Sequence, residues 1–142
     1  MNLSALRKTT PAKWILAPRL IAALPLFVFG SFHLTGMSPL LEILRRADIP
    51  FPEINFYLAP VFMVVSGLSL GVGYYARIGA LIATFAMLVA TYSKLVIEEW
   101  PGPMEIPLAL PLVVLAGCLV VLIKGPGAWS ADLKATACAD NP

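Results

Sequence analysis

Arg19 and His33 are the residues of this chain whose type and position most suggest chemistry. Both lie in a long apolar run, where an ionisable side chain is costly and therefore indicates a functional site. At helical spacing, His33 falls within about 40° of the face that carries Arg19. Imidazole titrates near neutral pH, so His33 could donate a hydrogen bond to a quinone carbonyl or transfer its protons.

Both residues also have a structural interpretation. Arg19 could extend to lipid headgroups from a position near the helix end, or pair with Asp132 in the C-terminal tail. His33 could simply hydrogen-bond a neighbouring helix. The residues alone leave these alternatives open.

Other polar residues are expected at the same end of the molecule as His33. If the apolar runs pack together, Glu53, Tyr57 and Tyr92 converge on it, and Asn55, Lys94 and Glu105 lie near them. An apolar pocket with few polar groups is the default binding site of a small ligand. The predicted ligand-binding set is therefore His33, Arg19, Tyr57, Tyr92 and Glu53. Glu53 could instead stabilise a helix start through the helix dipole.

Metal and nucleic-acid chemistry are not expected. With 1 histidine and 2 cysteines, one chain cannot build a Cys/His zinc site or a bis-histidine haem. Cys118 lies in an apolar run and Cys138 in the tail, so they form no CxxC pair; we expect Cys118 to pack inertly. The net charge of +2 is too small to indicate a nucleic-acid partner.

Four apolar runs must position these residues, at 14–36, 54–75, 78–97 and 106–123. A helix needs about 20 mostly apolar residues to cross about 30 Å of hydrocarbon, and a chain in lipid must satisfy its backbone groups internally. The chain is 13% charged, against about 25% in soluble proteins. We therefore predict an all-α integral membrane four-helix bundle over 14–124, with tails at 1–13 and 125–142.

Charge predicts the orientation of this bundle. With both termini in the cytoplasm, the outer side holds only three basic side chains, those of Arg45, Arg46 and Lys94. The cytoplasmic side then holds the others: Arg7, Lys8, Lys13, Arg19, Arg77, Lys124 and Lys134. This bias agrees with the positive-inside rule.

The first outer loop is predicted to contain a short amphipathic helix. Ser38 is a typical cap residue, Pro39 suits the first helical position, and apolar residues follow at 40, 41, 43 and 44. We expect this helix to lie at the outer membrane face.

Small residues are predicted to mediate helix packing, because lipid gives little hydrophobic drive between apolar helices. The second run contains a GxxxG element, Gly67 and Gly71, which we expect to face a small-residue stripe in the third run. That stripe comprises Gly79, Ala83, Ala86 and Ala90. Homodimerisation through these residues is the alternative.

Three segments together resemble the DoxX family of small four-helix membrane proteins. The first combines Arg19-Leu20 with the stretch from Leu26 to Leu34, which includes Gly30 and His33. The second is the glycine-rich stretch 66–80, and the third is Gly125-Pro126-Gly127 followed by Ser130 and Asp132. The resemblance covers roughly 19–133.

The resemblance implies a bundle in a bacterial or archaeal plasma membrane. Some DoxX proteins are associated with thiosulfate oxidation that feeds quinone, and others with thiol redox homeostasis. The function we predict is an accessory subunit of a quinone- or thiol-linked membrane redox system, with quinone as the candidate cofactor. Its expected partners are lipid, a membrane redox protein or a second copy. The alternatives are a non-enzymatic lipid- or partner-binding assembly factor and, more weakly, a transporter. Many relatives carry a glutamate where this chain has 63–66, Met-Val-Val-Ser.

Overall fold

The computed structural model describes residues 12–36, 38–101 and 106–133, and this part of the chain is helical without any β-strand. The predicted all-α class is confirmed. The elements in order are η1 (Lys13–Ile15), α2 (Leu16–Leu34), α3 (Leu40–Arg46), α4 (Pro52–Val72), α5 (Ala76–Val96) and α6 (Ala109–Lys124).

Three of the helices are long and apolar enough to cross a membrane: α2 together with η1, α4 and α5. Large apolar side chains cover their outer surfaces; Leu24 is 63% exposed and Phe85 64% exposed. Exposed apolar surface of this extent marks contact with lipid or a partner rather than with water. The fourth apolar helix, α6, is shorter, with 16 residues. It begins at Ala109 rather than at 106, because Pro107 disfavours the helical conformation at Ile106.

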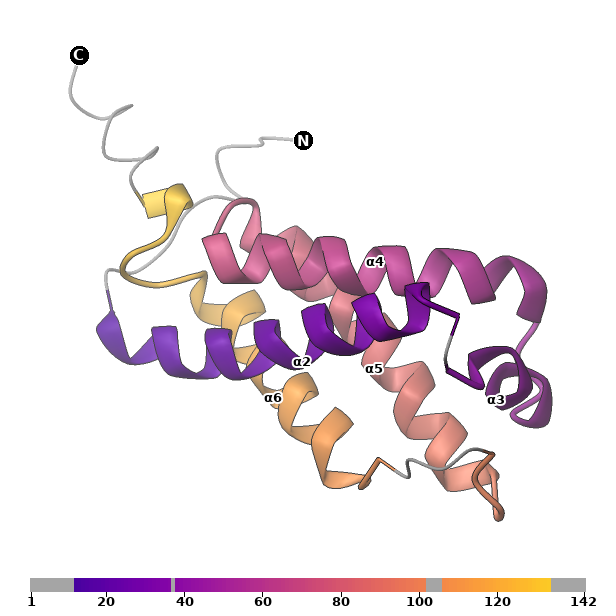
Figure 1. The fold of residues 1–142 in the computed structure, drawn as a ribbon. Helices are drawn as coiled ribbons and strands as arrows, with labels where there is room; N and C mark the ends of the chain where they lie inside the picture. The colour runs from indigo at the N-terminus through magenta and orange to yellow at the C-terminus, as the bar shows by residue number, and fades with distance from the viewer. Residues whose placement is uncertain (1–11, 37, 102–105, 134–142) are drawn as a thin grey trace.

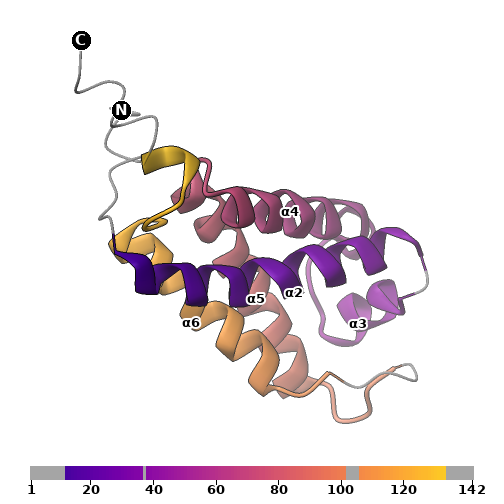
Figure 2. The same cartoon turned by 60° about the vertical axis from the view of Figure 1, so that its left-hand side comes forward.

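The three long helices and α6 surround a common core. α2 packs against α4 and α6, and α5 packs against the same two helices. Figures 1 and 2 show α5 and α6 crossing the pair α2 and α4 at an angle, so that the pairs spread apart toward α3. We call that end the α3 end, and the opposite end, where η1 and residues 125–133 lie, the tail end.

The predicted loop helix is present as α3, but its apolar face packs on protein. Ile43 and Leu44 are buried, and α3 contacts α4 and α5. Arg45 pairs with Glu53 of α4 at 3.3 Å. Pro39 occupies the N-cap position and no side chain caps this helix, so the prediction that Ser38 caps it is wrong.

The two small-residue stripes do not face each other as predicted. A Cβ at Gly67 would lie 2.8 Å from the backbone nitrogen of Phe27, so this glycine faces α2. A Cβ at Gly79 would lie 2.6 Å from Ser69 Oγ, so α5 meets a different face of α4. Gly67 and Ser69 point about 200° apart around a helix, which lets α4 present small residues to two neighbours.

The remaining small residues of the two stripes lie in three different environments: beside α2, in the core and at a cavity. Gly71 lies beside α2, where a Cβ would be 4.0 Å from that of Ala23. Ala83 is fully buried in the core. Ala86 and Ala90 line a cavity at the α3 end.

Candidate functional site

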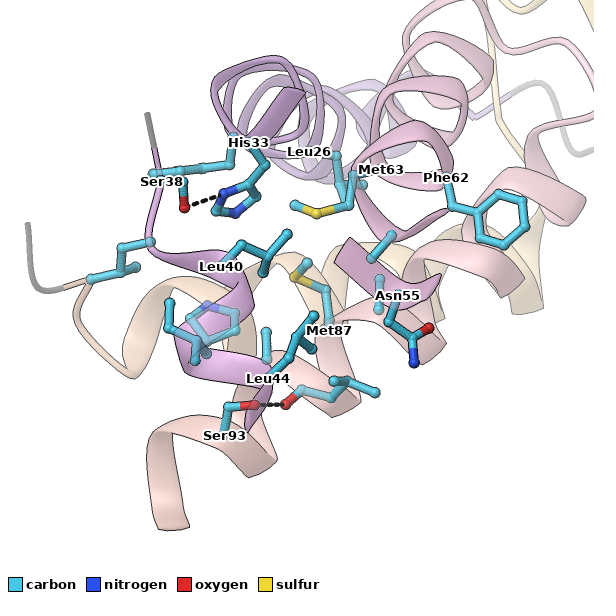
Figure 3. Close-up of a pocket in the computed structure, with 18 of the residues that line it drawn as sticks. Leu26, His33, Ser38, Leu40, Leu44, Asn55, Phe62, Met63, Met87 and Ser93 are labelled. Atoms are coloured by element: carbon cyan, nitrogen blue, oxygen red, sulfur yellow. Dashed lines mark hydrogen bonds between the residues drawn. The ribbon is translucent and has the colours of Figure 1, made fainter. Parts of the chain in front are cut away.

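The spreading helices and α3 enclose a cavity of about 490 Å³ at the α3 end. Its lining is mostly apolar and comes from α2, α3, α4, α5 and the first turns of α6. Leu26, Leu40, Met63 and Met87 are among the lining residues (Figure 3). Small-molecule pockets typically have volumes of about 300–1,000 Å³ and apolar walls, so this cavity has the size and character of a ligand site.

His33 is the main polar group of the cavity. Its Nδ1 lies 2.6 Å from Ser38 Oγ, and Figure 3 shows the imidazole beside Ser38 at one edge of the lining. Among the described residues, Nε2 of His33 makes no hydrogen bond. Since Ser38 holds one ring nitrogen, the second is available to a ligand as a donor or an acceptor, according to the tautomer.

The other polar side chains of the lining have protein partners. Asn55 donates to the carbonyl of Pro50 at 2.8 Å, and Ser93 donates to the carbonyl of Val89 at 2.9 Å. The Lys94 ammonium lies 4.1 Å from the centre of the Trp100 ring, where a cation–π attraction holds it. These interactions single out His33 as the group free to recognise a ligand.

The structure brings only one of the predicted ligand residues, His33, into the cavity lining. Tyr57 and Tyr92 are 72% and 49% exposed and line no part of it. Glu53 lies on the surface, where it pairs with Arg45. Tyr57 precedes the lining residue Leu58 by one position, a rotation of about 100° that turns its ring outward.

Arg19 lies at the tail end, far from His33 along α2, and its side chain is buried at 2% exposure. Its Nη1 donates to the carbonyl of Pro126 at 2.8 Å and its Nη2 to that of Trp129 at 3.3 Å. Asp132 adds an electrostatic attraction. Arg19 therefore fastens the C-terminal segment 125–133 to α2 and does not extend to headgroups.

Asp132 completes this polar cluster at the tail end. It is fully buried, and its two carboxylate oxygens accept the N–H groups of Tyr75 and Ala76, each at 3.1 Å. Its own N–H donates to the carbonyl of Gly73 at 3.0 Å. The carboxylate thus caps the N-terminus of α5, where a negative charge is stabilised.

The cysteines and possible metal ligands add no second site to the described residues. Cys118 is fully buried in the apolar core, as expected. Cys138 and Glu105 lie outside the described residues. Among the described residues, no group of His, Cys, Asp and Glu side chains could hold a metal ion.

Ser38, which the residue pattern predicts to be a helix cap, instead contacts the imidazole of His33. Gly36 ends the chain reversal after α2 with φ of +72°, a conformation that glycine adopts readily. The chain then returns toward α2 and Ser38 reaches His33. In the sequence, Gly36 between His33 and Ser38 at the end of a helix was the feature that could have predicted this contact.

Comparison with known proteins agrees with this architecture. The model of the DoxX family matches residues 14–95, more than half of the chain. That segment contains His33, Ser38 and Arg19, and it ends before α6 and Asp132. No curated protein and no solved structure matches the chain. Together with its long apolar helices, the family match identifies the chain as a membrane protein that belongs to the DoxX family.

Proposed function

We propose that this protein binds a quinone in the cavity at the α3 end and serves as an accessory subunit of a quinone- or thiol-linked membrane redox system. The observation that carries the proposal is the placement of one available polar group, His33, in an apolar cavity of about 490 Å³. A quinone has the matching chemistry, a carbonyl-bearing ring that is otherwise apolar.

The chain's own part in this function is to bind and orient. Ser38 holds the imidazole through Nδ1, which sets the direction of Nε2. A quinone carbonyl accepts a hydrogen bond when Nε2 carries the proton, and Met63 and Met87 offer polarisable surface for the ring. A bound quinone would supply the electron chemistry, and a partner protein would exchange electrons with it.

The membrane arrangement that we propose has four spans in a prokaryotic plasma membrane, with both termini in the cytoplasm. As a helix, α6 is about 24 Å long, and residues 106–108 extend it toward the outer face. The basic residues at the tail end support this orientation. The α3 end, with the cavity, then lies in the outer half of the bilayer.

Titration of decylubiquinone into purified protein in lipid nanodiscs tests the site. His33→Ala should weaken binding about threefold to tenfold, the effect of losing one hydrogen bond of about 0.5–1.5 kcal/mol. Ser38→Ala should weaken it less, because the imidazole remains but loses its orientation. Tyr57→Phe, which removes a hydroxyl outside the cavity, is the matched control and should bind as wild type does.

Melting measured in parallel separates binding from folding. If His33 is only structural, His33→Ala lowers the melting temperature of ligand-free protein and leaves the affinity of the folded fraction unchanged. If wild type binds no quinone, the redox proposal fails, and a lipid- or partner-binding assembly role replaces it.

A further inference from the structure

The cavity is covered by α3 at the end that faces the loops. The apolar face of α3 is buried, with Leu44 at 3% and Ile43 at 8% exposure. Polar contacts hold the helix in place: Arg46 donates to the carbonyl of Glu99 at 3.0 Å, and Arg45 pairs with Glu53. Ser38, just before α3, bonds to His33. Entry from the aqueous side would require these contacts to break.

The side of the cavity between α4 and α5 is bordered by apolar side chains instead of polar contacts. These two antiparallel helices are in close contact near the tail end, where Gly79 meets Ser69. Because the two helices run in opposite directions from that contact, Phe62 lies at about the same height as Phe85, and Leu58 at about the same height as Val89. All four of these side chains line the cavity.

The same four side chains are also exposed. Leu58 and Phe62 are each 42% exposed, Val89 is 40% exposed and Phe85 is 64% exposed. They line the cavity and are exposed, whereas Leu26, Met87 and Val114 of the same lining are buried, so we place the four residues at an opening of the cavity rather than in its closed interior. We call the opening that these four residues border the α4–α5 portal.

We infer that the ligand enters the cavity sideways from the bilayer through the α4–α5 portal and leaves its tail there. This inference rests on the proposed function and adds the class of ligand: an amphiphile with a small polar ring and a linear apolar tail. The ring reaches His33, while the tail lies between Phe62 and Phe85 and continues into lipid.

The chemistry of the portal supports this assignment. Its four residues carry no polar group, so they exclude a hydrated or charged ligand but bury methylene groups at about 0.8 kcal/mol each. Phe62 and Phe85 can rotate about their side-chain bonds, so they can admit a chain without moving the backbone. The polar group lies on α2, which does not border the portal, so a ligand whose ring reaches His33 can extend its tail toward the opening.

Two tryptophan substitutions on α5 form a matched pair for the test. Val89 borders the portal, whereas Val96 has a similar exposure of 46% and does not line the cavity. Binding of a tail-free dimethoxymethylbenzoquinone and of decylubiquinone is measured in nanodiscs, with empty nanodiscs as the correction for partitioning into lipid. Val89→Trp should weaken decylubiquinone binding about tenfold, the effect of about two methylene groups no longer buried, and leave the tail-free quinone unchanged. Val96→Trp should bind both quinones as wild type does.

Each other outcome has a defined meaning. Equal decylubiquinone affinity in the two variants overturns the portal while the proposed function stands. Equal loss of both quinones in Val89→Trp also overturns it, because the effect then lies in the cavity itself. Absence of any quinone binding in wild type defeats the proposed function and this inference with it. If Val89→Trp does not fold, Leu58→Trp narrows the portal from α4 and is expected to give the same selective loss.

Discussion

The carboxylate of Asp132 caps α5 by accepting the backbone N–H of Ala76 at 3.1 Å. The first N–H groups of a helix have no partner within it, and a buried helix end must find one elsewhere. Here the partner comes from a segment 56 residues further along the chain. The segment 125–133 is thereby fixed to the turn between α4 and α5, and Arg19 fixes it to α2.

Removal of the Asp132 carboxylate should therefore loosen the tail end. Asp132→Ala leaves two N–H groups unpaired and the buried Arg19 without its countercharge, so we expect unfolding to cost about 3–5 kcal/mol less. Asp132→Asn keeps one acceptor oxygen, so its free energy of unfolding should lie between those of Asp132→Ala and wild type. Chemical or thermal unfolding in detergent measures the difference.

The matched control for Asp132 is Glu53, an exposed acidic residue paired with Arg45. Glu53→Ala should change stability by no more than about 1 kcal/mol, as for other surface ion pairs. Wild-type stability of Asp132→Ala would show that the cap contributes nothing to the fold.

Gly73 and Gly36 have the same φ, +72°, but different surroundings. A Cβ at Gly73 would lie 2.5 Å from that of Ser130, whereas a Cβ at Gly36 would meet nothing within 4 Å. Alanine at either position should cost about 1–2 kcal/mol for the left-handed backbone. Gly73→Ala should cost about 1–3 kcal/mol more, because it also pushes the C-terminal segment away. Equal melting temperatures of the two variants would contradict this packing.

Gly67 and Gly71 provide a second comparison within one motif. Gly67 leaves no room for a side chain, since its Cβ would lie 2.8 Å from the nitrogen of Phe27. Gly67→Ala should thus separate α2 from α4 and destabilise the protein by about 1–3 kcal/mol. Gly71→Ala adds only an ordinary contact at 4.0 Å and should be neutral or stabilising by up to about 1 kcal/mol, because alanine favours a helix. The reverse order in a melting experiment would show that Gly71, rather than Gly67, is at the close contact.

Reporter fusions test the proposed orientation. A fusion after Lys134 should be cytoplasmic, and one at Asp48, just after α3, should be extracytoplasmic. A reporter after Lys134 that is active outside the cytoplasm would exclude the four-span arrangement, since an even number of spans places both termini on one side.

The sequence alone determined the all-α class and the approximate positions of the helices, because hydrophobic runs of this length act locally and need no knowledge of neighbours. It also identified His33 as a candidate ligand residue and named pairing with Asp132 as one role for Arg19. These conclusions depend on the type of a residue and its place in a run.

Only the tertiary structure decided which side chains meet. Helical spacing placed Arg19 and His33 on neighbouring faces, but only the packing of the helices showed that the C-terminal segment binds Arg19 while a cavity forms beside His33. Tyr57 and Tyr92 turn outward, and Gly67 packs on α2 rather than α5, because rotation about each helix axis is set by contacts between helices. The cavity itself arises from the angle between helix pairs, a property that no single run of residues encodes.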